Sequence, residues 1–71
     1  MIVDRKHTEI FDQVHQMYAE GTSNNSDVEL KPTENDIQKL LSSEGWIANE
    51  IEIWFDNLQN IWRWFCKINK A

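Results

Sequence analysis

Two histidines, one cysteine and a surplus of carboxylates are the side chains in this sequence that could act in catalysis or bind a metal ion. His7 and His15 are eight residues apart, about two helical turns, so one metal ion could not reach both on one helix face. Cys66 has no histidine or aspartate at the spacing of a catalytic pair, and an inert thiol is predicted. Glu50 and Glu52 are two residues apart and diverge on a helix. The sequence therefore predicts no metal site, no cofactor, no small-molecule substrate and no enzymatic activity.

The composition describes one small acidic domain spanning residues 1–71. Seven Lys or Arg stand against twelve Asp or Glu, which gives a formal net charge of −5. So short a chain buries enough apolar surface only if its core side chains are large, and four Trp, three Phe and one Tyr supply that bulk. The single cysteine excludes an intrachain disulfide framework and favours a reducing compartment.

Membrane and secretory classes are not expected. No apolar run approaches the ~20 residues that a spanning helix needs, and the charges at residues 4–6 interrupt any signal-peptide core. The negative charge also argues against strong non-specific nucleic-acid binding, because that affinity comes from Lys and Arg side chains that neutralise phosphates.

Three helices are predicted from hydrophobic spacing. Residues 8–20 form the first, with apolar residues at i, i+1, i+4, i+7 and i+8: Ile10, Phe11, Val14, Met17 and Tyr18. A loop follows at residues 21–33, because its first residues favour turns. The third and longest helix is predicted at residues 48–68, with these side chains on one side: Ile51, Trp54, Phe55, Leu58, Trp62 and Phe65.

The second helix, residues 34–44, has the clearest boundaries. Thr33 is the predicted N-cap and Asp36 can reach back to it in a capping box. Gly45 is predicted to end the helix in the left-handed backbone region. The helix contributes an apolar stripe at i, i+3 and i+4: Ile37, Leu40 and Leu41.

A helix, a short turn and a longer helix make a helix-turn-helix arrangement. Within the longer helix, residues 50–57 end in Trp54-Phe55-Asp56-Asn57, which resembles the Trp-Phe-x-Asn signature in the recognition helix of homeodomains. Pro32-Thr33-Glu34, Leu40 and Gly45-Trp46 extend the resemblance backwards. Together they are most similar to the homeodomains with an enlarged loop between the first two helices, including fungal mating-type regulators.

The resemblance implies an all-α, three-helix homeodomain-like bundle whose third helix lies in the DNA major groove. Carried over by position, Asn57 would read adenine, and Asn60 stands one helical turn away on the same outward side. Leu40, Ile51, Trp54 and Phe55 would be core. The residues expected at DNA, on the groove-facing side, at phosphates or in an N-terminal arm are Asn57, Asn60, Ile53, Asp56, Arg63, Lys67, Arg5 and Lys6.

The sequence departs from the family at the charges. Within the predicted third helix only the basic residues Arg63 and Lys67 follow Asn57, and Asp56 places a carboxylate where it would repel phosphate. We therefore expect a nuclear transcriptional regulator that binds double-stranded DNA weakly alone and needs a protein partner.

The alternative is a homeodomain descendant that has lost DNA binding and binds another protein, either through an apolar patch of Ile53, Ile61 and Trp64 or through the acidic surface of the first two predicted helices. Trp62, Trp64 and Phe65 could equally fold back to enlarge the core. If Trp64 points outward, we expect Trp54→Ala to unfold or strongly destabilise the domain. Trp64→Ala should then leave the stability of the domain nearly unchanged.

Overall fold

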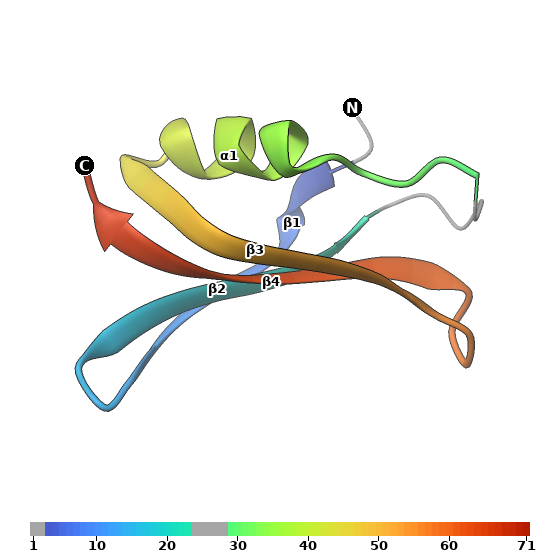
Figure 1. Ribbon diagram of the computed structural model, residues 1–71, viewed down its shortest axis with the longest axis horizontal. Helices are drawn as coiled ribbons and strands as arrows, with labels where there is room; N and C mark the ends of the chain where they lie inside the picture. Colours follow the sequence, from blue (N-terminus) through green and yellow to red (C-terminus); the bar gives the residue numbers. More distant parts are fainter. Residues whose placement is uncertain (1–2, 24–28) are drawn as a thin grey trace.

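The structure is a computed structural model that describes residues 3–23 and 29–71, with the side chains of residues 3–7 outside the description. Five elements follow one another along the chain: β1 (Val3–Gln13), β2 (Gln16–Ser23), α1 (Glu34–Ser42), β3 (Trp46–Asp56) and β4 (Ile61–Lys70). The strands form one antiparallel sheet in the order β1-β2-β4-β3. The helix lies across one face of this sheet, and no described element covers the other face (Figure 1).

The predicted three-helix bundle and its helix-turn-helix are therefore wrong. Residues 8–20, expected as one helix, form most of the β1–β2 hairpin, and residues 48–68 form most of β3, a turn and most of β4. Aromatic and β-branched side chains fill both segments and favour strands. Only the second predicted helix is present.

The β3–β4 hairpin shows why the helical pattern was misleading. Buried Trp62, Trp64, Cys66 and Ile68 alternate along β4 with half-buried side chains that face away from α1. Apolar residues on both sides of the strand hide the two-residue period of a half-buried strand. A register shift between Asn49 and Glu52 further breaks the alternation along β3.

Helix α1 confirms the predicted capping box. The Asp36 backbone N–H donates to Thr33 Oγ1 at 3.1 Å, and the Thr33 backbone N–H donates to Asp36 Oδ2 at 3.0 Å. These two bonds satisfy amides that the first turn of a helix leaves unpaired. Gly45 has the predicted left-handed backbone, with φ of 84°.

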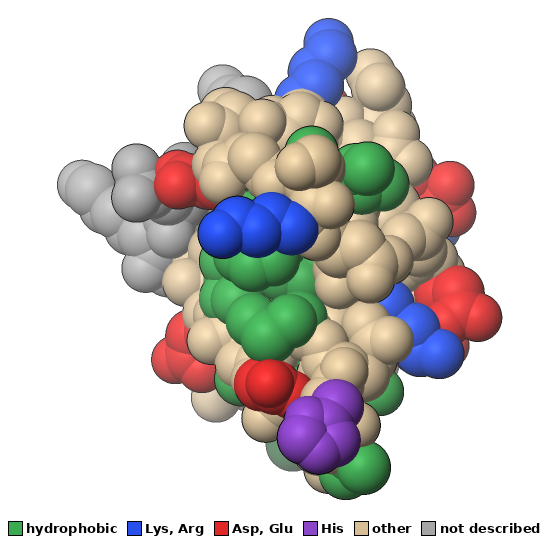
Figure 2. Space-filling view, turned by 90° about the vertical axis from the view of Figure 1, so that its left-hand side faces the viewer, with side chains coloured by type: hydrophobic (Ala, Val, Ile, Leu, Met, Phe, Trp, Pro, Cys, Tyr) green, Lys and Arg blue, Asp and Glu red, His purple; other side chains and the backbone are tan. Residues whose placement is uncertain are grey.

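The core lies between α1 and the sheet. Its buried residues are Ala19, Ile37, Leu40, Leu41, Ala48, Trp64, Cys66 and Ile68. Partly buried Met17 and Trp46 pack against them. Figure 2 looks at the end of the molecule where α1 ends and β3 begins, and there hydrophobic side chains reach the surface among charged ones. Apolar side chains are thus exposed at this end.

The loop predicted at residues 21–33 is shorter than expected. Residues 21–23 belong to β2, residues 24–28 lie outside the described residues, and Glu29 to Thr33 lead into the helix. Among the described residues, no helix is both long and apolar enough to cross a membrane.

Candidate functional site

The sheet face turned away from α1, here called the open face, gathers side chains from all four strands. Side chains alternate between faces along a strand, and residues paired across strands share a face. The open face therefore includes Glu9, Phe11, Tyr18, Glu20, Thr22, Glu52, Trp54, Asp56, Ile61, Arg63, Phe65 and Lys67, together with Gln13, Gln16, Ile47, Asn49 and Asn69. It combines aromatic rings with charges of both signs.

Three aromatic rings form a continuous row over β1, β2 and β4. The centroids of Phe11 and Tyr18 are 5.6 Å apart and those of Tyr18 and Phe65 are 5.2 Å apart, both stacked. Phe11 and Phe65 are 6.2 Å apart. Aromatic pairs of this kind contribute about 0.5–1.5 kcal/mol each beyond area burial. Because no described element covers this face, the three rings are only half-buried. Trp54 on β3 is 45% exposed.

Among the described side chains, the two cations of the open face, Arg63 and Lys67, are already paired within the chain. Arg63 Nε donates to Asp56 Oδ2 at 2.7 Å, and Arg63 Nη2 donates to Gln59 Oε1 at 2.6 Å. Lys67 Nζ lies 2.9 Å from Glu50 Oε2. The Arg63 hydrogen bond lowers the pKa of Asp56, and the Glu50 hydrogen bond raises the pKa of Lys67. The positive charge of this face is therefore locally neutralised.

Three carboxylates on the same face have no such partner. Glu9, Glu20 and Glu52 are exposed, and none has an ion pair or side-chain hydrogen bond among the described residues. Glu9 lies directly opposite Glu20 across β1 and β2. Like charges in directly opposed positions destabilise a sheet, by roughly 0.2–1 kcal/mol. Among the described side chains, the open face thus carries three unpaired carboxylates next to its aromatic row.

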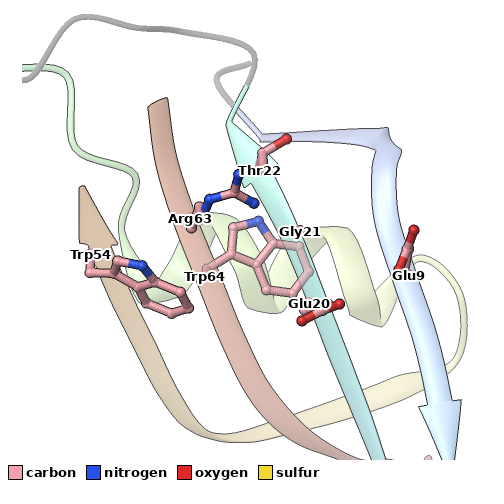
Figure 3. Close-up of a pocket in the computed structure, with 7 residues that line it drawn as sticks. All are labelled: Glu9, Glu20, Gly21, Thr22, Trp54, Arg63 and Trp64. Atoms are coloured by element: carbon pink, nitrogen blue, oxygen red, sulfur yellow. The ribbon is translucent and has the colours of Figure 1, made fainter. Parts of the chain in front are cut away.

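A hollow of about 370 Å³ lies in the open face. Its lining residues are Glu9, Glu20, Gly21, Thr22, Trp54, Arg63 and Trp64 (Figure 3). The Glu9 and Glu20 carboxylates and the exposed Trp54 ring border the hollow on this face, beside the Arg63 guanidinium that is paired with Asp56. The hollow therefore offers carboxylate oxygens and an aromatic surface to one ligand group.

The residues predicted to read DNA do not form one surface. Asn57 and Asn60 lie exposed in the β3–β4 turn, rather than one turn apart on a helix. Asp56, Arg63 and Lys67 are held in the ion pairs of the open face. Ile53 faces α1, and the side chains of Arg5 and Lys6 in β1 lie outside the description. The recognition helix on which the DNA-binding hypothesis rested is replaced by two strands and a turn.

The apolar patch predicted for protein binding is also not formed. Ile53 and Trp64 face α1, and Trp64 is only 1% exposed, so the prediction that it points outward is wrong. Ile61 lies on the opposite face of the sheet. The alternative prediction that Trp62 and Trp64 enlarge the core agrees with their burial, whereas Phe65 lies on the open face.

Sequence reasoning missed the open-face residues Glu9, Phe11, Tyr18, Glu20 and Phe65. A weak signal was present: the β-branched and aromatic side chains Thr8, Ile10, Phe11 and Tyr18 favour strands on either side of a two-residue gap, although polar and apolar residues do not alternate there. The helical spacing of the same residues concealed it.

The described side chains offer little for nucleophilic catalysis or for metal binding. Cys66 is buried, and desolvation raises the pKa of its thiol to about 11, which disfavours the reactive thiolate. Among the described residues, no three His, Cys, Asp or Glu side chains are placed to hold a metal ion.

Comparisons of the chain with protein-family models, with curated proteins and with solved structures find no match.

Proposed function

We propose that this protein is a binding module that docks a basic, partly apolar segment of another protein on its open face. The observation that carries the proposal is the set of unpaired carboxylates Glu9, Glu20 and Glu52 beside the aromatic row, on a face whose own cations are already neutralised. Such a face offers charge complementarity to Lys or Arg side chains and apolar contact area to their neighbours.

The hollow next to Trp54 suits one cationic side chain of the partner. A guanidinium or ammonium group there can pair with Glu9 or Glu20, and an exposed indole attracts cations through its ring face. A second copy of this chain fits poorly, because docking two open faces would oppose carboxylates with carboxylates in a protein of net charge −5.

An NMR titration tests the docking face. The probe is a synthetic arginine-rich peptide with interspersed leucines, and the control peptide replaces each arginine by citrulline, which keeps the shape but removes the charge. Of the four indoles, only that of Trp54 lies on the open face. We expect the arginine peptide to shift the indole N–H signal of Trp54 and to leave that of Trp46 unchanged, because Trp46 packs against the core and does not line the hollow.

Two single substitutions test the role of the carboxylates. Glu20→Gln removes one charge from the open face, and Glu34→Gln removes one charge from the first turn of α1 on the other side of the sheet. Since an exposed ion pair is worth about 0.2–1 kcal/mol, Glu20→Gln should weaken peptide binding up to about fivefold, while Glu34→Gln should have little effect.

Equal weakening by both substitutions would show that only net charge matters. Equal binding of the arginine and citrulline peptides would show that charge complementarity plays no part. Either result would overturn the proposed function, as would a binding response to duplex DNA that exceeds the response to the peptide.

A further inference from the structure

The turn between β1 and β2 has an unusual backbone for its sequence. Gln13 and Gln16 form the last cross-strand pair, so Val14 and His15 alone connect the strands. Both have positive φ, 54° and 64°, which is the geometry of a type I′ turn. Such turns favour Asn-Gly, because Asn and Gly tolerate positive φ. A β-branched valine at positive φ is a true outlier.

Nothing in the described part of the chain compensates for this strain. Val14 is 89% exposed, and the exposed His15 side chain has no hydrogen bond or ion pair among the described residues. An outlier of this type is commonly found where the residue serves binding or catalysis rather than folding. The observation therefore points to a contact that the isolated chain does not make.

The position of the turn agrees with such a contact. Figure 1 shows that the β1–β2 and β3–β4 turns both lie on the side of the sheet away from α1, one at each end of the open face. Each turn carries one large exposed apolar side chain, Val14 in the first and Leu58, 96% exposed, in the second. The two turns thus flank the face that the proposed partner would cover.

We infer that the Val14-His15 turn is a contact element for the partner, and that its strained sequence is kept because the partner covers the Val14 side chain. This inference rests on the proposed function, and it adds a specific apolar contact outside the sheet. The arginine peptide with interspersed leucines supplies both the charges for the face and apolar side chains for the turn.

The test compares two variants with the wild type in thermal unfolding and in peptide binding. Val14→Asn/His15→Gly installs the preferred type I′ sequence, so its melting temperature should rise by about 4–8 °C. The same variant should bind the arginine peptide about tenfold more weakly, since a buried valine side chain is lost. Val14→Ile keeps an apolar β-branched side chain and should retain wild-type affinity.

Each other result has a defined meaning. A double variant that is no more stable than the wild type would show that the turn stores no strain. A double variant that is more stable but binds equally well would show that the turn is not a contact. Both results overturn this inference and leave the proposed function standing, whereas a wild type that does not bind the peptide overturns the two together.

Discussion

The two tryptophans Trp54 and Trp64 differ in environment although both lie in the same hairpin. Trp64 is 1% exposed in the core, whereas Trp54 is 45% exposed on the open face. We expect Trp64→Ala to reduce the free energy of unfolding by about 3–5 kcal/mol, because it leaves a large cavity. Trp54→Ala should reduce it by only about 1 kcal/mol. Urea unfolding measures both, and a larger loss for Trp54→Ala would contradict this assignment of faces.

Cys66 should make stability depend on alkaline pH. Its folded-state pKa of about 11 lies above the ordinary value of 9.0, because burial disfavours the thiolate. A raised pKa stabilises the fold fully below the unfolded pKa, and this contribution is lost as pH rises from about 9 to 11. The loss amounts to about 2 kcal/mol.

The measurement for Cys66 is urea unfolding at increasing pH, with Cys66→Ala as the control that lacks the thiol. The wild type should lose more stability than the control between about pH 9 and pH 11. Parallel losses in the two proteins would show that other groups account for the whole dependence.

At the scale of elements, the capping box of α1 gives a prediction with a matched control. Thr33→Ala removes the acceptor of the Asp36 backbone N–H, so unfolding free energy should fall by about 1 kcal/mol. Ser42→Ala, near the other end of the helix, removes a hydroxyl without a capping role. This control should change the free energy of unfolding by less than about 0.5 kcal/mol. Similar losses of unfolding free energy in the two variants, measured by urea unfolding, would show that the capping box does not stabilise the fold.

The same box links α1 to acid stability. The Thr33 backbone hydrogen bond lowers the pKa of Asp36 below its ordinary value of 3.8. A lowered pKa stabilises the fold above the unfolded pKa, and the contribution disappears as pH falls through the folded pKa. Wild type and Asp36→Asn should therefore converge in stability at low pH. A difference that stays constant from neutral to acid pH would contradict this link.

The sequence predicted α1 correctly because its signals are local. Thr33, Asp36 and Gly45 define the ends of the helix through bonds and backbone angles that involve only near neighbours. The sheet also depends on pairing between distant residues, such as Glu20 of β2 with Phe65 of β4, which local periodicity cannot register. The β1–β2 turn also lacks the usual signal, since Val14-His15 stands where Asn-Gly is typical.

The open face could be predicted only after the strands were assigned. Phe11, Tyr18 and Phe65 lie far apart in the sequence and meet because three strands place them in one row. In a helical reading, Tyr18 and Phe65 both turn inward and Glu20 remains an isolated surface charge. One wrong period assignment therefore moved the aromatic part of the candidate site into the core and separated it from the carboxylates.

At the scale of the molecule, charge and apolar area are distributed unequally over the two sides of the sheet. The helix covers one side and buries Ile37, Leu40 and Leu41 against it. The other side keeps its aromatic row half-buried, and the opposed pair Glu9 and Glu20 reduces stability. A sheet selected only for stability would not combine these features, which is consistent with a face that is completed by a partner.

Salt should act in opposite directions on stability and on binding. At 0.1 M salt, charges farther apart than about 10 Å are largely screened, so added salt weakens the repulsion in a protein of net charge −5 and between Glu9 and Glu20. The melting temperature should therefore rise modestly with sodium chloride. Affinity for the arginine peptide should fall over the same range, because the attraction to the open-face carboxylates is screened as well.

The double variant Glu9→Gln/Glu20→Gln separates these effects from a general salt effect. Because the variant lacks the opposed pair, its melting temperature at low salt should be higher than that of the wild type and should rise less as salt is added. Its affinity for the arginine peptide at low salt should be lower and should fall less over the same range. Thermal unfolding and peptide titration across a salt series measure both. If the variant and the wild type respond equally in both measurements, Glu9 and Glu20 are ordinary surface charges. The loss of stability from opposing these two carboxylates would then not be explained by a role in binding.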